Sequence, residues 1–579
     1  MKRALDWLDR RTGYRGALAT LFDEELRGGA SLAYTLGRGL LMIVIVQAVT
    51  GMLLMATYVP SVSSAWSSVY YVQYVVTAGW FIRGMHHYGA SAVMIVMGLH
   101  LFQVVVYGAY KSPREVSWWS GLVLMKLVMG LALTGYLLPW DQQAYWASMV
   151  TTSVAGGIPL VGPTIKQLVI GGIEYGQLTI SRFYFLHVVV LPLSVVLVFF
   201  AHYALFRRHG VTPAGDTPPA RRTGEPYLRR QVWMDLVVGL LVIGSVAAFA
   251  IHERGAPLDA PADPSVDYPP RPEWYFRFLF QLFKLLPGNL EVLASVVLPG
   301  MVALFLVALP FLDRADSNRL KLRWRWVAPV LFGLIGVIAL TAHSLYLDSK
   351  DVDYIHAKHR AKQRAQRAIE LARAGIPPDG PLAMLARDPL VGGGDLYRTH
   401  CTKCHVLGGE GEREAPDHDG FGSREWILGM MHHPQDVQYF GTTKIDDMPS
   451  QKKLGEPALK AIAEFLYAQG QEPGEASVDK SLIPEGERLF QTKCMRCHTF
   501  ENDGDFDGIG GPELTGYASR LWIYRQTMDP EKHYGDLNEM PAFNDELTAE
   551  EGLLLARFLR LQRYQPAATV PSARLPHRR

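Results

Sequence analysis

Long runs of apolar residues recur seven times in the first 350 positions of the chain and then stop. Each run is about 20 residues long, roughly the length of helix that crosses the hydrocarbon core of a bilayer. The pattern predicts an all-α fold that begins as a polytopic membrane helix bundle. The predicted helices cover residues 36–58, 80–109, 115–138, 183–206, 231–251, 291–312 and 326–347.

The chain changes character after the last of these helices. Residues 358–373 form a charged run that is predicted to be helical, and residues 375–394 are rich in proline and glycine, which is typical of a linker. Two copies of a short module follow. The predicted parts are a surface segment at 1–35, a four-helix part at 36–210, a three-helix part at 211–347, a linker at 348–392, and two small α-helical modules at 393–470 and 471–579.

Composition supports a membrane protein but says little about partners. Apolar residues make up 49% of the chain, which is unusual for a soluble protein of this size, whereas 57 basic and 55 acidic residues almost cancel. We expect no nucleic-acid partner. Residues 1–30 are charged throughout and lack the apolar stretch of a cleavable signal peptide, so we expect them to lie on the membrane surface.

Basic residues favour one side of the predicted bundle. The N-terminal segment and the connections after the second, fourth and sixth helices are rich in Lys and Arg, whereas residues 59–79 contain neither. The positive-inside rule places the N-terminus in the cytoplasm. Because the number of spans is odd, everything after residue 348 is predicted to lie on the opposite side.

Four histidines occur in pairs on two predicted helices. His86 and His100 are fourteen residues apart, and His187 and His202 are fifteen apart. Four helical turns take about 14.4 residues, so each pair lies on one helix face at two depths. Neutral imidazoles bind haem iron, and this arrangement predicts two stacked b-type haems, ligated by His86 with His187 and by His100 with His202. The alternative is four unrelated histidines bonded to backbone carbonyls.

Glycines on the first and third predicted helices repeat the same interval. Gly37 and Gly51 are fourteen residues apart, as are Gly121 and Gly135. A glycine lets a flat macrocycle approach the backbone, which supports the haem hypothesis, although glycine in membrane helices more often serves helix packing.

Each C-terminal module carries the attachment motif of a c-type haem. The motifs are Cys401-Thr-Lys-Cys404-His405 and Cys494-Met-Arg-Cys497-His498, and these are the only four cysteines of the chain. Met448 and Met540 lie 43 and 42 residues after their histidines, and both precede proline. The cysteines are predicted to attach the haems, and the histidines and methionines to ligate the irons. A zinc or redox-dithiol site is the disfavoured alternative. Because bacteria attach such haems outside the cytoplasm, we predict a bacterial inner-membrane protein with a periplasmic tail.

Residues 30–350 resemble cytochrome b of the cytochrome bc and bf complexes. The first four helices resemble cytochrome b of the bf type, and the next three resemble its separate three-helix subunit, here joined in one chain. The matching segments are Arg83-Gly-Met-His86, Gly135-Tyr-Leu-Leu-Pro-Trp-Asp-Gln142, Arg182-Phe-Tyr-Phe-Leu-His187 and Pro272-Glu-Trp-Tyr275.

The segment after the fifth helix is a candidate quinol site. Prolines forbid a continuous helix there, so Glu273 is presented from a rigid loop, where a carboxylate can accept a proton from quinol. Alone, Glu273 would more often be an ordinary interfacial side chain. The resemblance makes the segment the signature of a quinol-oxidation pocket and adds Tyr136 as a second pocket position. The candidate catalytic residues are Tyr136, Pro272, Glu273, Trp274 and Tyr275.

The resemblance also assigns residues around the membrane haems. Arg83 and Arg182 match positions that pair with haem propionates, and Arg207 is a further candidate near the cytoplasmic haem. Interfacial snorkelling is the alternative for these arginines. Relatives of the bf type attach an extra haem through a cysteine, where this chain has Thr35. We therefore expect no covalently bound third membrane haem, while an unattached one stays possible.

The expected function is that of a quinol:cytochrome c oxidoreductase core. The resemblance implies bifurcated quinol oxidation, quinone reduction on the cytoplasmic side, proton translocation, and onward electron transfer through the c haems to a downstream acceptor. It also implies a homodimer and a Rieske iron-sulfur partner, which must be a separate subunit because every cysteine here is committed to haem. The rivals are a di-haem b anchor that serves an attached dehydrogenase without bifurcation, and a passive electron conduit without quinone chemistry.

Overall fold

The computed structural model describes residues 2–16, 25–26, 29–212, 225–266, 268–315, 317–445, 448–472, 475, 477–501, 511–531 and 538–564. The chain divides into two compact units, residues 1–382 and 383–579, which we describe separately.

Seven helical spans in the described part of unit 1 are long and apolar enough to cross a membrane, which confirms the predicted all-α membrane bundle. The fourth span runs from Gln177 to His209 and is longer than predicted. The spans are η1 with α3 (Leu32–Tyr34, Thr35–Met55), α5 (Gly79–Tyr107), α6 (Glu115–Tyr136), α9 with η2 and α10 (Gln177–Phe185, Leu186–Val190, Leu191–His209), α11 (Tyr227–His252), η5 with α13 (Leu293–Val297, Leu298–Leu312) and α14 (Leu320–Asp348).

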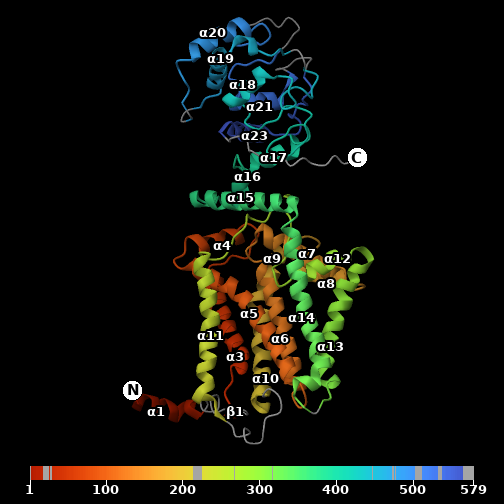
Figure 1. Cartoon of the computed structure of the whole chain (residues 1–579). Coiled ribbons are helices and arrows are strands. Elements are labelled where there is room, and N and C mark those ends of the chain that lie inside the picture. Colours follow the sequence, from red (N-terminus) through yellow and green to blue (C-terminus); the bar gives the residue numbers. More distant parts are fainter. Residues whose placement is uncertain are drawn as a thin grey trace. The chain divides into compact units, whose positions relative to one another are not determined.

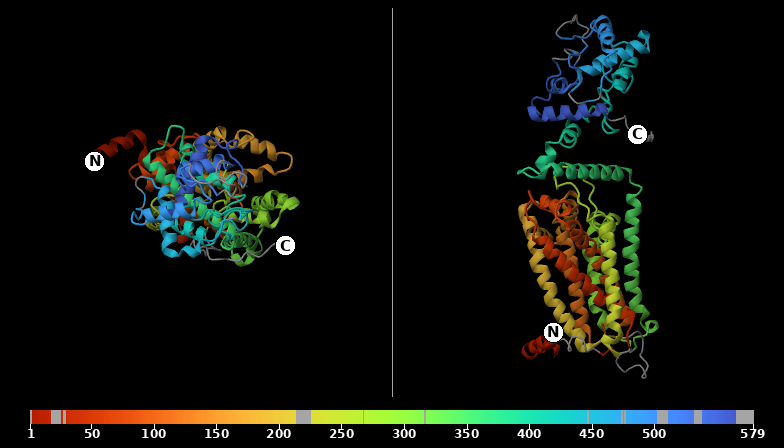
Figure 2. Two further views of the ribbon diagram at one scale, coloured as in Figure 1. Left: turned by 90° about the horizontal axis from the view of Figure 1, so that it is seen from above. Right: turned by 90° about the vertical axis from the view of Figure 1, so that its left-hand side faces the viewer.

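Shorter elements close the two ends of the bundle, seen in Figures 1 and 2. We call the end where α14 finishes the upper end and the end with the N-terminal helix the lower end. The upper elements are α4 (Ala65–Tyr74), α7 (Gln142–Gly156), α8 (Gly162–Ile170), α12 (Arg277–Leu285), η4 (Gly288–Leu290) and α15 (Val352–Ala374). The lower ones are α1 (Lys2–Thr12) and the two-residue strands β1 (Glu25–Leu26) and β2 (Glu225–Pro226), which pair antiparallel.

The predicted four-helix part is built from two helix pairs. Helix α5 packs against α3, α10 packs against α6, and α11 packs on both α3 and α5. The fourth span contains a π-helical turn at Leu186–Val190, followed by Pro192 in the first turn of α10. Single π turns inside helices are frequent at functional sites. This one carries His187.

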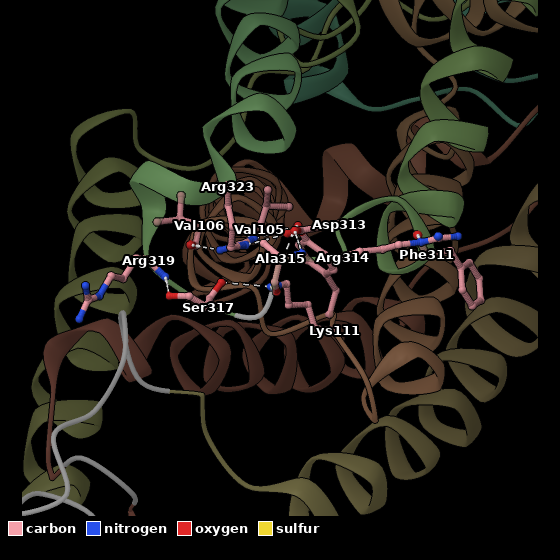
Figure 3. Close-up of polar contacts among 11 residues, drawn as sticks. Val105, Val106, Lys111, Phe311, Asp313, Arg314, Ala315, Ser317, Arg319 and Arg323 are labelled. Carbon is pink, nitrogen blue, oxygen red and sulfur yellow. Dashed lines mark hydrogen bonds and ion pairs between the residues drawn. The ribbon is translucent and has the colours of Figure 1, made fainter.

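A buried arginine joins the three-helix part to the four-helix part at the lower end (Figure 3). Arg323 of α14 is fully buried and pairs with Asp313, its Nε lying 2.7 Å from Oδ2. Its other nitrogens donate to the carbonyls of Val105 and Val106 at the end of α5, at 2.7 and 2.8 Å. The guanidinium therefore donates to carbonyls in the last turn of α5, where the regular hydrogen bonds of the helix run out.

We expect Arg323→Met to destabilise the fold by about 3–5 kcal/mol, because it leaves the Asp313 carboxylate buried without its main ion-pair partner. The measurement is denaturant unfolding of the detergent-solubilised protein, followed by helical circular dichroism. Arg325→Met is the matched control, since Arg325 is exposed two residues away in the same helix. Equal stability of the two variants would contradict a bridging role for Arg323.

Unit 2 is built from two similar sets of helices around one shared core. Helices α18 and α21 each start at a serine, Ser423 and Ser519, whose hydroxyl accepts a hydrogen bond from the backbone N–H three residues later. The helices are α17 (Gly392–His400), α18 (Arg424–His432), η6 (Lys452–Leu454), α19 (Glu456–Gln469), α20 (Ile483–Lys493), α21 (Arg520–Met528), α23 (Ala549–Leu561) and η8 (Gln562–Tyr564), preceded by α16 (Pro381–Ala386).

Candidate functional site

The structure brings the two histidines of the predicted upper pair close together. The rings of His86 on α5 and His187 in the π turn have centroids 6.2 Å apart and planes at 82°. That separation leaves room for an iron with a metal–nitrogen bond of ~2 Å on each side. His100 and His202 lie on the same two spans, fourteen and fifteen residues nearer the lower end.

Each of the four predicted glycines lies against one of these histidines. A Cβ added at Gly37 would sit 3.2 Å from Cε1 of His100, and one at Gly51 would sit 3.1 Å from Cε1 of His86. The same distances are 3.3 Å from Gly121 to His202 and 2.4 Å from Gly135 to His187. Any side chain at these four positions would press on an imidazole.

Hydroxyl groups hold three of the imidazoles through Nδ1. Thr50 donates its own proton to the Val46 carbonyl and lies 3.0 Å from Nδ1 of His86, so it accepts from the ring. Ser120 lies 2.9 Å from Nδ1 of His202, and Thr134 lies 3.2 Å from Nδ1 of His187. Backbone carbonyls of Ser117 and Leu131 accept from the same two nitrogens.

For the upper pair, this geometry fits b-type haem. When Nδ1 of an imidazole donates to an oxygen, Nε2 carries the free lone pair that binds iron, and the ring orientation is fixed. These hydroxyl groups were not predicted from the sequence. A signal was present, because each precedes a predicted glycine in the pairs Thr50-Gly51, Ser120-Gly121 and Thr134-Gly135. His100 departs from the pattern and has Gln103 Oε1 at 3.4 Å instead.

A small cavity at the upper end unites most of the candidate catalytic residues. Tyr136, Pro272, Glu273 and Tyr275 line it together with Leu133, Ala147, Thr151 and Phe276. Tyr136 directly follows Gly135, so the cavity lies next to the His187 end of the upper histidine pair. Trp274 does not line the cavity; its indole nitrogen lies 3.2 Å from the Ser91 hydroxyl.

Burial and neighbouring charge raise the pKa of acidic side chains in and near the cavity. Burial raises the pKa of Glu273, and the nearby Asp141 carboxylate adds to the rise. Burial also raises the pKa of Asp141, and it raises the pKa of Asp259 to about 6. The Tyr268 hydroxyl donates to Asp259 at 2.7 Å. Three acids with raised pKa, Glu273, Asp141 and Asp259, therefore lie at the upper end.

Two arginines flank the Glu273 segment and share one carboxylate. Asp348, at the end of α14, pairs with Arg271 and with Arg277, in each case with nitrogen and oxygen 2.9 Å apart. Arg271 also stacks over the Tyr354 ring of α15 at 4.2 Å. The segment that carries Glu273 is thus fixed at both ends.

The three predicted propionate arginines lie in different surroundings. Arg83 is buried, and its guanidinium donates to the carbonyls of Ala256 and Pro257 and to Gln73. Arg182 is exposed and donates to the Leu168 carbonyl. Arg207 lies in the last turn of α10. Their role toward haem stays a prediction.

A buried carboxylate at the lower end was not predicted. Asp235 of α11 pairs with Arg38 at 2.9 Å and accepts hydrogen bonds from the Tyr227 hydroxyl and the Gln231 amide at 3.1 and 2.8 Å. Arg38 directly follows Gly37, which packs on His100. An acidic residue inside an apolar span is itself a signal of function.

The two Cys-x-x-Cys-His motifs have matching surroundings. Nδ1 of His405 donates to the Pro416 carbonyl at 2.7 Å, and Nδ1 of His498 donates to the Pro512 carbonyl at 3.0 Å. Burial lowers the pKa of both histidines, which keeps the rings neutral, as iron binding requires. The cysteines have no disulfide, and Met448 and Met540 pack against the shared core. The donor set fits covalent haem.

One further histidine of unit 2 was not predicted as a site residue. His418 stacks on His405, with ring centroids 4.1 Å apart and planes at 16°, and its Nδ1 lies 3.0 Å from the Tyr397 hydroxyl. Aligning the two repeats on Pro416 and Pro512 would have found it, since the second repeat has Leu514 at this place.

Family models match three parts of the chain. The model described as cytochrome b/b6/petB matches residues 23–210, and the one described as cytochrome b(C-terminal)/b6/petD matches residues 261–352. The model described as cytochrome C oxidase, cbb3-type, subunit III matches residues 481–559.

Curated proteins and solved structures agree with these matches. The menaquinol:cytochrome c reductase cytochrome b subunit of Geobacillus thermodenitrificans is 38% identical over 220 residues, 37% of this chain and 98% of the relative. Cytochrome b6 of Stigeoclonium helveticum is 36% identical over 212 residues, 37% of this chain and 99% of the relative. A structure of a hyperthermophilic respiratory complex III matches with TM-score 0.52 and 27% identity, covering 59% of this chain and 91% of that chain.

Proposed function

Since the chain belongs to the cytochrome b family of bc and b6f complexes and carries a cytochrome c domain, we propose that it performs bifurcated quinol oxidation as the core of a quinol:cytochrome c reductase-type complex. The observation that carries the proposal is the cavity shared by Glu273 and Tyr136 beside the upper histidine pair. It places the partly buried Glu273 carboxylate, a proton acceptor, close to the histidines that would hold the upper haem, an electron acceptor.

Quinol oxidation needs a base and a dry site. Glu273 is held in a proline-fixed segment, and as a carboxylate it accepts a proton from a quinol hydroxyl; Tyr136 and Tyr275 shape the cavity around it. The acids Asp141 and Asp259 lie on the same side and offer further proton-accepting groups toward the upper surface. In this proposal, protons leave at the upper end.

Four haems would supply one-electron transfer when bound: two b-type at His86/His187 and His100/His202, and two c-type at the Cys-x-x-Cys-His motifs. The buried Asp235 and Arg38 beside the lower pair support quinone reduction and proton uptake at that end. We place the lower end in the bacterial cytoplasm and the tail in the periplasm. The proposed partners are a separate Rieske protein, a downstream electron acceptor and a second copy of the chain.

The haem content is checked with pyridine haemochrome spectra. Two b haems extractable by acidified acetone and two retained c haems per polypeptide are expected. Loss of either class would remove the corresponding ligand assignment. A third extractable haem would point to an unattached site near Thr35, which is buried and donates to the Leu32 carbonyl.

Bifurcation is tested against the di-haem anchor by adding oxidant to membranes supplied with quinol. If the two electrons of quinol take different routes, a pulse of oxidant oxidises the high-potential acceptors. Quinol can then pass one electron to these acceptors and the other to the b haems, so the level of reduced b haem rises. A non-bifurcating anchor predicts that the same pulse only oxidises the b haems. Rise or fall of the b-type absorbance therefore decides between the two functions.

We expect Asp348→Asn to raise the KM for quinol about tenfold, roughly 1.4 kcal/mol, because it releases both arginines that fix the Glu273 segment. The uncompensated arginines also lower the pKa of Glu273, so the rise of the rate with pH should move to lower pH. Steady-state kinetics across pH measures both effects. Asp353→Asn, at an exposed position of α15, is the control, and an unchanged KM and pH profile in Asp348→Asn would exclude a positioning role.

A further inference from the structure

The two c-type repeats of unit 2 are interlocked by an exchange of helices. Each repeat has a front half with the Cys-x-x-Cys-His motif and a back half with the methionine. The front halves span residues 392–418 and 483–514, and the back halves span 424–469 and 520–561. Helix α17 of the first front half packs against α23 of the second back half, and α20 of the second front half packs against α19 of the first back half.

Side chains pack closely at the first of these contacts, between α17 and α23. A Cβ at Gly393 would lie 2.6 Å from Cβ of Phe558, and the ring of Tyr397 lies 5.5 Å from the ring of Phe558. At the end of α17, His400 lies 3.1 Å from the Glu546 carboxylate and 5.9 Å, ring to ring, from Phe543. Phe543 follows Met540 by three residues, so the Met540 loop lies beside the helix that leads into Cys401.

Equivalent residues seal the second contact. A Cβ at Gly486 would lie 2.8 Å from Cβ of Phe465, and the rings of Phe490 and Phe465 are 5.4 Å apart. Phe500, two residues after His498, also packs on Phe465 at 5.5 Å. Gly486, Phe490 and Phe465 occupy the repeat positions of Gly393, Tyr397 and Phe558. The exchange is therefore reciprocal.

The chain crosses over at two matching hinges, residues 420–423 and 516–519. Gly420 and Gly516 have φ of +69° and +67°, and at the next matching pair Gly422 has +73° and Ala518 has +58°. A Cβ at Gly422 would lie 2.8 Å from Cβ of Ala518, so the hinges touch. Left-handed φ at a non-glycine residue is uncommon and marks a backbone held by its surroundings. Two hydrogen bonds within the first repeat lie around this crossing. Trp426 Nε1 donates to the Asp417 carbonyl, and the Asp417 N–H donates to the Gln438 carbonyl.

Each methionine is tied to its own back half. The N–H of Gln451, three residues after Met448, donates to the Met431 carbonyl at the end of α18, and α18 packs on α19. The N–H of Phe543 donates likewise to the Thr527 carbonyl of α21, and α21 packs on α23. Because each back half packs against the front half of the other repeat, each methionine lies on the side of that other front half.

We propose that the two c-type sites are completed reciprocally, with His405 paired with Met540 and His498 paired with Met448. The inference rests on the c haems of the proposed function and replaces the pairing of each histidine with the methionine of its own repeat. The two haems are then held in one cooperative unit, joined further by the ion pair of Lys444 and Glu539 at 2.8 Å, which links the two methionine loops.

Chains with one c haem identify the partner of each histidine. In Cys401→Ser/Cys404→Ser, the remaining haem is attached beside His498. In that background, Met448→Ala should abolish the far-red charge-transfer absorption of methionine-bound ferric iron and lower the reduction potential, while Met540→Ala should change neither. The Cys494→Ser/Cys497→Ser background should show the opposite dependence. The proposal would be overturned if the band were lost on replacing the methionine that belongs to the same repeat as the remaining haem.

A cross-linking experiment on the intact chain does not depend on haem removal. A benzophenone amino acid in place of Tyr397 should label the peptide of residues 549–561, and one in place of Phe490 should label the peptide of residues 456–469. Labelling within the same repeat would refute the exchange. Covalent haem, counted on the same samples, separates this outcome from the proposed function, because chains without c haem would fail that function whatever the cross-links show.

Discussion

Gly135→Val is expected to leave one b-type haem per chain instead of two. A Cβ at this position would lie 2.4 Å from Cε1 of His187 and 2.9 Å from its Nδ1, so the imidazole must leave the place where it faces His86. Neither helix can yield easily, because α10 packs closely on α6. Haemochrome spectra of the purified variant measure the loss, and quinol-driven reduction of the remaining haem should be absent.

The same helix provides a matched control. A Cβ at Gly130 meets only the Leu191 side chain, at an ordinary contact distance of 3.5 Å. Gly130→Val adds the same volume and should keep both haems. Two retained haems in Gly135→Val would show that His187 is not a ligand in the arrangement described.

Glu273→Gln is expected to slow quinol oxidation by about 10²-fold or more, the range typical for loss of a general base. The amide keeps the size of the side chain but cannot accept the proton. Because burial raises the pKa of Glu273, the wild-type rate should rise with pH as the carboxyl group ionises, and this dependence should vanish in the variant. Stopped-flow reduction of the b haems by quinol, measured across pH, records both effects.

The control for this experiment is Glu253→Gln, which changes a carboxylate whose side chain is 53% exposed at the same end of the bundle. It should leave rate and pH profile unchanged. A passive electron conduit predicts wild-type kinetics for both variants, so a normal rate in Glu273→Gln would favour that rival.

The membrane part was largely predictable because its signals are local. Hydropathy and length alone predict all seven spans, and helical periodicity places His86 and His100 on one face. The grouping of Tyr136 with Glu273 came from the resemblance alone. The pairing of Asp348 with Arg271 and Arg277 could not be foreseen, because it joins the end of one span to a loop about 75 residues earlier, and no periodicity reports such contacts.

The helix exchange in unit 2 was beyond the reach of sequence patterns for a different reason. Gly393 and Gly486 are the same residue type, as are Phe465 and Phe558, so sequence patterns do not indicate which front half packs on which back half. Repetition predicts the kind of contact but not which copies make it. The left-handed backbone at Gly420, Gly422, Gly516 and Ala518, where the chain crosses over, could not be predicted from the repeat either.

The exchange also sets the order in which the tail can mature. During synthesis, α17 is made long before α23, the helix it packs against, which lies almost at the end of the described residues. Under the proposed function, the first Cys-x-x-Cys-His motif would therefore receive its haem on an unfinished module, before the last helix has been made. A premature stop anywhere in the second repeat would leave both modules incomplete rather than one.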